Sequence, residues 1–197
     1  MSGVLGAVLA GGKSSRMGTD KAGAVLAGKT LLERSYGILA TVFPRVVIVG
    51  HTSHSLKMVH TIVDIRRDCG PLGGLHAALT FAQRQGDEGV FLLACDMPFV
   101  RPAVVRMLTQ SLSGYDAAAP LLEGRFEPLC AAYAVSCLPT VSKQLKEGML
   151  DLQTLLAGVR TRAAQGSALR RLDPLLDSFR NINTAKDLKD AALSLGG

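Results

Sequence analysis

Three short, continuous apolar runs, at residues 4–9, 46–49 and 90–95, and a fourth strand-like segment at residues 61–65 divide the first half of the chain. Apolar runs of this length are typical of strands that are buried on both faces. The segments between them have the composition of helices and loops. Strands that alternate with helices predict an α/β fold, with a mostly parallel sheet and helices on both of its faces.

Three helices follow from the same half of the sequence. Thr30, with Glu33 three residues later, forms a capping box and predicts a helix start. The Gly- and Pro-rich residues 66–74 predict a loop, and a helix is expected over residues 75–84. Pro102 suits the first turn of a third helix, which is expected to reach about residue 112.

The alternation weakens from residue 116 onward. Residues 117–122 and 127–134 read as two strands joined through residues 123–125, which predicts an antiparallel edge on the parallel sheet. Two helices are expected near residues 138–147 and 152–159. Residues 179–183 predict a last short strand.

The chain is expected to close with a helix that Thr184 and Asp187 cap, and to form a single domain over residues 1–197. Its apolar N-terminal run is too short for a membrane span and lacks a basic flank, so neither a span nor a signal peptide is predicted. The four cysteines, at 69, 95, 130 and 137, have no C-x-x-C spacing, which argues against a zinc site. Reduced, mostly buried thiols in a cytoplasmic protein are expected.

The net charge of +6 favours an anionic partner. Nucleic acid is disfavoured, because the basic residues are scattered and aromatic residues, at 5% with no Trp, are too few for base-stacking platforms. A small phosphorylated ligand is the simpler interpretation.

The first apolar run stops at Gly11 and Gly12, and a basic loop with Lys13, Arg16 and Lys21 follows. Adjacent glycines let backbone amides face a ligand, and fixed cations complement them, so the loop suits a triphosphate. A P-loop is excluded, because Ala7 stands where its first glycine is required and the spacer is mostly strand. A loop directly after the first strand lies where open α/β sheets bind ligands.

Two aspartates follow later strands. Asp96 ends the most apolar strand, where a carboxylate needs a partner to offset its desolvation. Beside a triphosphate it is expected to bind Mg²⁺. The alternative is that it caps the following turn. Asp68 is a candidate for a ribose or base contact or a water-mediated metal contact, the alternative being an ordinary turn residue. The loop histidines 51, 54 and 60 lack metal-site spacing and are expected to be solvated.

No catalytic nucleophile is evident, which fits direct attack by a substrate phosphate on a bound nucleotide. Four motifs together resemble the molybdenum cofactor guanylyltransferases. They are Leu-Ala-Gly-Gly-x-x-x-Arg-Met-Gly-x-Asp-Lys at 9–21, Gly-Pro-Leu-Gly-Gly-Leu at 70–75, Cys-Asp-Met-Pro-Phe at 95–99, and Asn-Ile-Asn-Thr at 181–184 with Asp-Leu at 187–188. The first motif alone is shared by many nucleotidyltransferases, and the order of all four gives the resemblance its specificity.

The resemblance implies a Rossmann-like fold of the nucleotide-diphospho-sugar transferase type and Mg²⁺-dependent transfer of GMP from GTP to molybdenum-molybdopterin. It implies a mainly nucleotide-binding N-terminal half and a mainly acceptor-binding C-terminal half. The GTP contacts carry over as Leu9, Ala10, Gly11, Gly12, Lys21, Asp68 and Asp96, with Asp96 as the metal ligand. The expected catalytic residues are Arg16, Lys21 and Asp96, and the expected acceptor residues are Arg125, Asn181 and Asn183.

Several points stay open. The family can place a nucleotide-contacting asparagine where this chain has Val49-Gly50-His51, and His51 either replaces it or is solvated. The related cytidylyltransferases usually read Leu-Ala-Ala-Gly at the first motif, so Gly12 favours guanine. A non-catalytic nucleotide- or pterin-binding protein is a further alternative. A labile product is expected to pass directly to a delivery protein or a molybdoenzyme chaperone.

Overall fold

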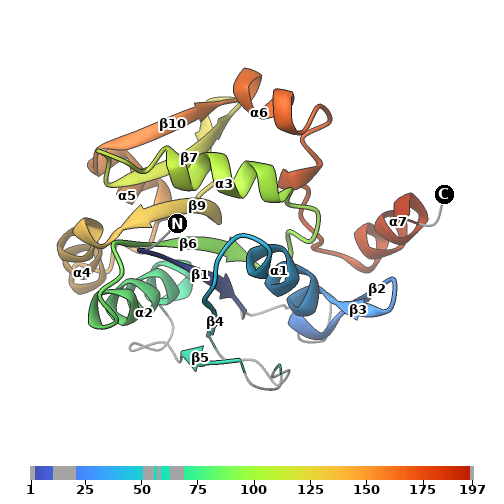
Figure 1. Ribbon diagram of the computed structural model, residues 1–197, viewed down its shortest axis with the longest axis horizontal. Helices are drawn as coiled ribbons and strands as arrows, with labels where there is room; N and C mark the ends of the chain where they lie inside the picture. Colours follow the sequence, from blue (N-terminus) through green and yellow to red (C-terminus); the bar gives the residue numbers. More distant parts are fainter. Residues whose placement is uncertain (1–2, 11–20, 51–55, 57–58, 63–68, 196–197) are drawn as a thin grey trace.

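The computed structural model describes residues 3–10, 21–50, 56, 59–62 and 69–195. Within these residues an eight-stranded sheet runs in the order β10-β7-β9-β6-β1-β4-β5, and β8 pairs with β7 beside this path (Figure 1). Helices cover both faces of the sheet. The predicted α/β architecture is confirmed.

One half of the sheet consists of the parallel strands expected from the first half of the sequence, with β5 at its outer edge. They are β1 (Val4–Leu9), β4 (Val46–Val49), β5 (Thr61–Ile62) and β6 (Gly89–Ala94). β1 lies between β4 and β6 and is parallel to both. All six residues of β6 are buried, because helices lie over both of its faces. The expected continuation of β5 to residue 65 falls outside the described residues.

The antiparallel pairing predicted for the second half is confirmed, in β7 (Ala117–Leu122), β8 (Arg125–Phe126) and β9 (Cys130–Ala134). β9 is antiparallel to both β6 and β7, and it lies between them. The edge strand on this side of the sheet is β10 (Thr161–Gln165), which is parallel to β7 and was not expected from the sequence. Its small and charged residues lack the apolar run that marks the other strands.

Two helical layers enclose the sheet. One face carries α1 (Leu31–Ala40), α3 (Pro102–Gln110) and α6 (Gly166–Leu172). The other carries α2 (Gly70–Arg84), α4 (Leu138–Lys146) and α5 (Leu152–Gly158). The capping box is present as predicted: Thr30 Oγ1 accepts from Glu33 N at 3.1 Å, and Thr30 N donates to Glu33 Oε2 at 2.6 Å.

Two expectations for loops and strands are wrong. The loop over residues 66–74 is too long, because α2 already begins at Gly70. Pro71 fits the first turn, where an amide proton is not needed, and Gly73 and Gly74 are buried by close packing. The strand at residues 179–183 is absent; a short 3-10 helix (Asp177–Phe179) comes first, and the following chain crosses the end of β6 without joining the sheet. α6 was also not predicted.

The predicted closing helix is α7 (Ala185–Leu195). It packs on a small hairpin, β2 (Val25–Leu26) and β3 (Lys29–Thr30), through a separate apolar cluster (Figure 1). Among the described residues, no helix has both the length and the apolar character to cross a bilayer. Burial raises the pKa of the Cys137 thiol to about 12, as expected of a buried, unreactive cysteine.

Candidate active site

The candidate site lies at the carboxyl edge of the parallel strands, where β1 and β6 end side by side. Cys95 N donates to Leu9 O at 3.1 Å, and Ala10 N donates to Val49 O at 2.8 Å. These bonds continue the sheet one residue beyond the strands. Leu9 and Ala10, both predicted GTP contacts, are thereby fixed at this edge.

Gly50, directly after β4, packs closely against Ala10, directly after β1. Its φ is +111°, and a Cβ at this position would lie 2.1 Å from Ala10 O. No other residue fits, because a side chain would collide with the main chain and the backbone conformation favours glycine. The end of β4 is thus pressed against the start of the predicted triphosphate loop.

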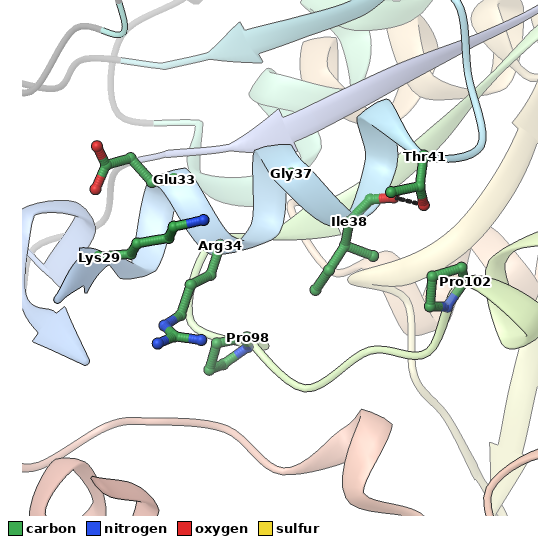
Figure 2. A pocket seen from close by; sticks show the side chains of 8 residues that line it. All are labelled: Lys29, Glu33, Arg34, Gly37, Ile38, Thr41, Pro98 and Pro102. Atoms are coloured by element: carbon green, nitrogen blue, oxygen red, sulfur yellow. Dashed lines mark hydrogen bonds between the residues drawn. The ribbon is translucent and has the colours of Figure 1, made fainter. Parts of the chain in front are cut away.

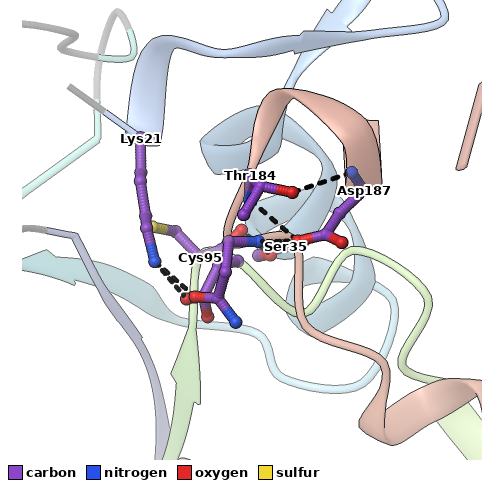
Figure 3. Close-up of polar contacts among 7 residues, drawn as sticks. Lys21, Ser35, Cys95, Thr184 and Asp187 are labelled. Atoms are coloured by element: carbon purple, nitrogen blue, oxygen red, sulfur yellow. Dashed lines mark hydrogen bonds and ion pairs between the residues drawn. The ribbon is translucent and has the colours of Figure 1, made fainter. Parts of the chain in front are cut away.

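Three predicted site residues meet at this edge. Lys21 Nζ lies 3.3 Å from Asp96 Oδ2 and donates to Asn183 Oδ1 at 2.6 Å. Lys21 and Asp96 are partly exposed, at 26% and 19%, so both remain accessible to a ligand. In Figure 3 dashed lines mark the interactions that leave the Lys21 amine, near Cys95.

The main chain around Asp96 is held from two sides. Ile182 N donates to Asp96 O at 2.9 Å, and the buried Ser35 hydroxyl donates to Cys95 O at 3.1 Å. Ser35 acts from α1 as a positioning residue that was not expected from the sequence. The available signal was a serine within the apolar stripe of that helix.

A helix cap fixes the backbone of Asn183. Asp187 Oδ2 accepts from the backbone N–H groups of Asn183 and Thr184, each at 2.8 Å, and Thr184 Oγ1 accepts from Asp187 N at 3.1 Å (Figure 3). The bond from Asn183 N, then that from Thr184, lowers the pKa of the Asp187 carboxyl group. The cap at the start of α7 therefore holds Asn183 where its side chain contacts Lys21.

Asp96 has one carboxylate oxygen available for a metal ion. Its Oδ1 is buried and has no hydrogen-bond partner among the described residues. Such an oxygen suits a hard cation, which offsets the desolvation of the carboxylate. The described residues hold no cluster of three or more His, Cys, Asp or Glu side chains that could bind a metal. A single carboxylate fits Mg²⁺, which takes its other ligands from phosphates and water.

The remaining predicted residues are more scattered. Arg125 lies exposed on β8, and Asn181 lies exposed before α7; no recorded hydrogen bond or ion pair joins either to Lys21 or Asp96. The other predicted residues lie outside the described part of the chain: Gly11, Gly12, Arg16, His51 and Asp68.

A pocket of about 350 Å³ beside α1 is a different feature (Figure 2). Its most polar side chains are engaged in the fold. Arg34 donates to the carbonyl groups of Leu26 and Ala27 in the hairpin, and Glu33 caps α1. This pocket is a structural groove at the hairpin rather than part of the site around Asp96.

Comparison with known proteins places the chain in a family. The model of the MobA-like NTP transferase domain matches residues 6–165. The molybdenum cofactor guanylyltransferase of Desulfosudis oleivorans is 33% identical over 202 residues, covering 99% of this chain and 97% of the relative. The probable molybdenum cofactor guanylyltransferase of Methanosarcina mazei is 36% identical, covering 93% of this chain and 87% of the relative.

The fold agrees with these sequence relationships. The crystal structure of molybdopterin-guanine dinucleotide biosynthesis protein A from Archaeoglobus fulgidus superposes with a TM-score of 0.84 at 31% identity, covering 98% of both chains. The resemblance that the four motifs indicate is confirmed by these matches. The chain belongs to the MobA-like NTP transferase family, among the molybdenum cofactor guanylyltransferases.

Proposed function

We propose that this protein transfers GMP from GTP to molybdenum-molybdopterin, releasing pyrophosphate and forming the guanine dinucleotide cofactor. The observation that carries the proposal is the junction of Lys21, Asp96 and Asn183 at the carboxyl edge of the sheet. This is the edge where open α/β sheets bind ligands. The names of the relatives, molybdenum cofactor guanylyltransferases, support the substrates.

The nucleotide is proposed to bind on the β1 side of Asp96. Leu9 and Ala10 present backbone at that edge, and Gly11 and Gly12, which follow them in the sequence, are proposed to contact the nucleotide as well. Lys21 and Arg16 neutralise the triphosphate, and Asp68 contacts the nucleoside. Gly12 is proposed to admit guanine in preference to cytosine.

The reaction is a direct displacement at phosphorus. An oxygen of the acceptor's terminal phosphate attacks the α-phosphorus of GTP, a new P–O bond forms, and the bond to the β-phosphate oxygen breaks. Pyrophosphate leaves with the electron pair of that bond. Lys21 stabilises the charge on the phosphate oxygens by a charge-assisted hydrogen bond.

Asp96 is proposed to hold Mg²⁺ through its unpartnered Oδ1. When bound, Mg²⁺ neutralises phosphate charge and polarises the reacting phosphate. Lys21, whose amine lies beside Asp96 Oδ2, would contact the phosphates of a nucleotide bound at this edge. Asn183 then keeps the amine at the site through its own hydrogen bond.

The acceptor is proposed to bind on the other side of Asp96, contacted by Arg125, Asn181 and Asn183. This gives one domain over residues 1–197, with a nucleotide-binding N-terminal half and an acceptor-binding C-terminal half. A cytoplasmic location and direct transfer of the labile product to a delivery protein or molybdoenzyme chaperone complete the proposal. No contact with nucleic acid or membrane forms part of it.

A nucleotide panel tests the proposal. Pyrophosphate release is measured with GTP, CTP and ATP, each with Mg²⁺ and with or without molybdopterin. Release that requires the acceptor and is much faster with GTP is expected. Equal or faster use of CTP would overturn the guanylyltransferase assignment, and release independent of the acceptor would reject a transferase.

A further inference from the structure

A second pocket, of about 290 Å³, lies at the same edge of the sheet. It is lined by Leu122, Arg125, Phe126, Glu127, Pro128 and Gln153. Residues 127–129 lead into β9, and Cys130 at the start of β9 is paired with Leu93 near the end of β6. The pocket therefore lies at the Asp96 end of β6, on the side opposite to β1.

Glu127 is the unusual residue of this pocket. Its carboxylate is partly buried, and among the described residues its recorded hydrogen bond is the one to Oε1 from Leu129 N, at 3.1 Å. Burial raises the pKa of the Glu127 carboxyl group, and the negative charge of Asp96 raises it further. The pocket thus lies within electrostatic reach of Asp96, and the carboxylate has acceptor capacity left for a ligand.

The chain around Glu127 is held rigidly. Gln153 bridges both main-chain groups of Phe126, with Nε2 donating to the carbonyl at 2.8 Å and Oε1 accepting from the amide at 3.3 Å. Glu127 N donates to Pro120 O at 2.9 Å, and the hydroxyl of Tyr133 donates to Pro128 O at 2.8 Å. The backbone that carries the Glu127 carboxylate is therefore organised before a ligand arrives.

The lining indicates the class of ligand. Leu122, Phe126 and Pro128 supply apolar walls, and Glu127 supplies an acceptor for two adjacent N–H donors. A 2-amino-4-oxopyrimidine ring carries two such donors side by side, the amino group and the neighbouring ring N–H. Arg125 suits a phosphate on the same ligand.

Two substrates of the proposed reaction carry this donor edge, the pterin of the acceptor and the guanine of GTP. The position of the pocket favours the pterin, because the pocket and β1 lie on opposite sides of β6. We propose that Glu127 binds the donor edge of the acceptor's pterin ring and selects that ring, an inference that rests on the function proposed above.

The test compares two fluorescent rings, 6-hydroxymethylpterin and lumazine, by direct binding without nucleotide. Lumazine has a carbonyl group where pterin has the 2-amino group, so it turns one donor into an acceptor. Wild-type protein is expected to bind the pterin at least about tenfold more tightly. Glu127→Gln, whose amide can donate to that carbonyl, is expected to abolish or reverse the preference.

Glu123→Gln is the matched control, because Glu123 is exposed at the turn between β7 and β8 and does not line the pocket. It should keep the preference of the wild type. An unchanged preference in Glu127→Gln, or no binding of either ring to the wild type, would overturn the proposal. Thermal melting of both variants checks that the fold is intact.

Steady-state kinetics separate the two rings that share the donor edge. Glu127→Gln should raise KM for molybdopterin by about tenfold and leave KM for GTP within about twofold. A rise in KM for GTP alone would assign Glu127 to guanine and reject the proposal. Ring binding needs no turnover, so it still decides the role of Glu127 if the nucleotide panel rejects the proposed function. If the wild type turns over GTP and molybdopterin but shows no preference between the rings, only this inference is rejected.

Discussion

Lys21 Nζ donates to Asn183 Oδ1 at 2.6 Å, joining residues that lie 162 positions apart in the sequence. The same amine lies 3.3 Å from Asp96 Oδ2. This hydrogen bond joins the segment before α7 to the Lys21 amine, which the proposed reaction requires. A second bond, from Ile182 N, joins the segment to the main chain of Asp96. The C-terminal segment is therefore a structural part of the site.

Asn183→Ala removes the acceptor that holds the Lys21 amine. We expect kcat/KM to fall by about tenfold, the size of a charge-assisted hydrogen bond. The melting temperature should change little, because the Asn183 side chain is exposed and its backbone cap by Asp187 persists. Lys189→Ala, an exposed change on α7, is the control and should leave the kinetics intact. Equal loss in both variants would contradict a specific role for Asn183.

The sequence predicts much of the sheet for a simple physical reason. Strands buried on both faces must be apolar throughout, so β1, β4 and β6 are visible as local runs. β10 lies at the sheet edge and carries polar residues, so no such run marks it. The start of α2 was missed because its Gly-Pro-Leu-Gly-Gly segment has the composition of a loop, although Pro is well suited to a first helical turn.

The site is predicted less completely, because its contacts are long-range. Motif order indicates that Lys21, Asp96 and Asn183 belong to one site, but the bond that places Asn183 on Lys21 follows from the path of the chain before α7. Ser35 looks like part of an apolar stripe until its hydroxyl is seen to hold the carbonyl of Cys95. Glu127 carries no motif, and its relation to Asp96 depends on the antiparallel pairing of β9 with β6.

Gly50→Ala should destabilise the protein strongly. The added Cβ would lie 2.1 Å from Ala10 O, at a φ of +111°. We expect a loss of about 3 kcal/mol or more in the free energy of unfolding, measured by urea denaturation.

Gly37→Ala is the matched control for that variant. Gly37 lies within α1, and a Cβ there meets nothing within 4 Å. This change should stabilise the protein by about 0.5–1 kcal/mol, because alanine is the better helix former. If both variants were equally stable, the close approach of β4 to Ala10 would be refuted.

Glu127→Gln should raise stability at neutral pH. Burial raises the pKa of Glu127 in the folded state, so the charged carboxylate opposes folding as pH rises through that value. We expect the variant to melt higher than the wild type at pH 7.5, by the order of 2 °C, with the gap closing toward pH 4. A lower melting temperature at pH 7.5 would contradict the account of this pocket.

Glu33→Gln should show the opposite dependence. Hydrogen bonds from the backbone and then the side chain of Thr30 lower the pKa of Glu33. Its stabilising contribution is present above the unfolded-state pKa and is lost as pH falls through the folded-state value. The variant should therefore melt lower than the wild type at pH 7.5 and approach it in acid. A gap that stays constant with pH would rule out the charged cap.

The central claim is transfer of a nucleotidyl group from GTP to molybdopterin at Asp96. The direct measurement uses GTP labelled at either the α- or the γ-phosphate, with Mg²⁺, molybdopterin, and wild-type or Asp96→Asn protein. We predict that the α-label enters the pterin product, that the γ-label leaves in pyrophosphate, and that Asp96→Asn slows both by about 10²-fold or more. Entry of the γ-label into the product, or an undiminished rate in Asp96→Asn, would contradict the account.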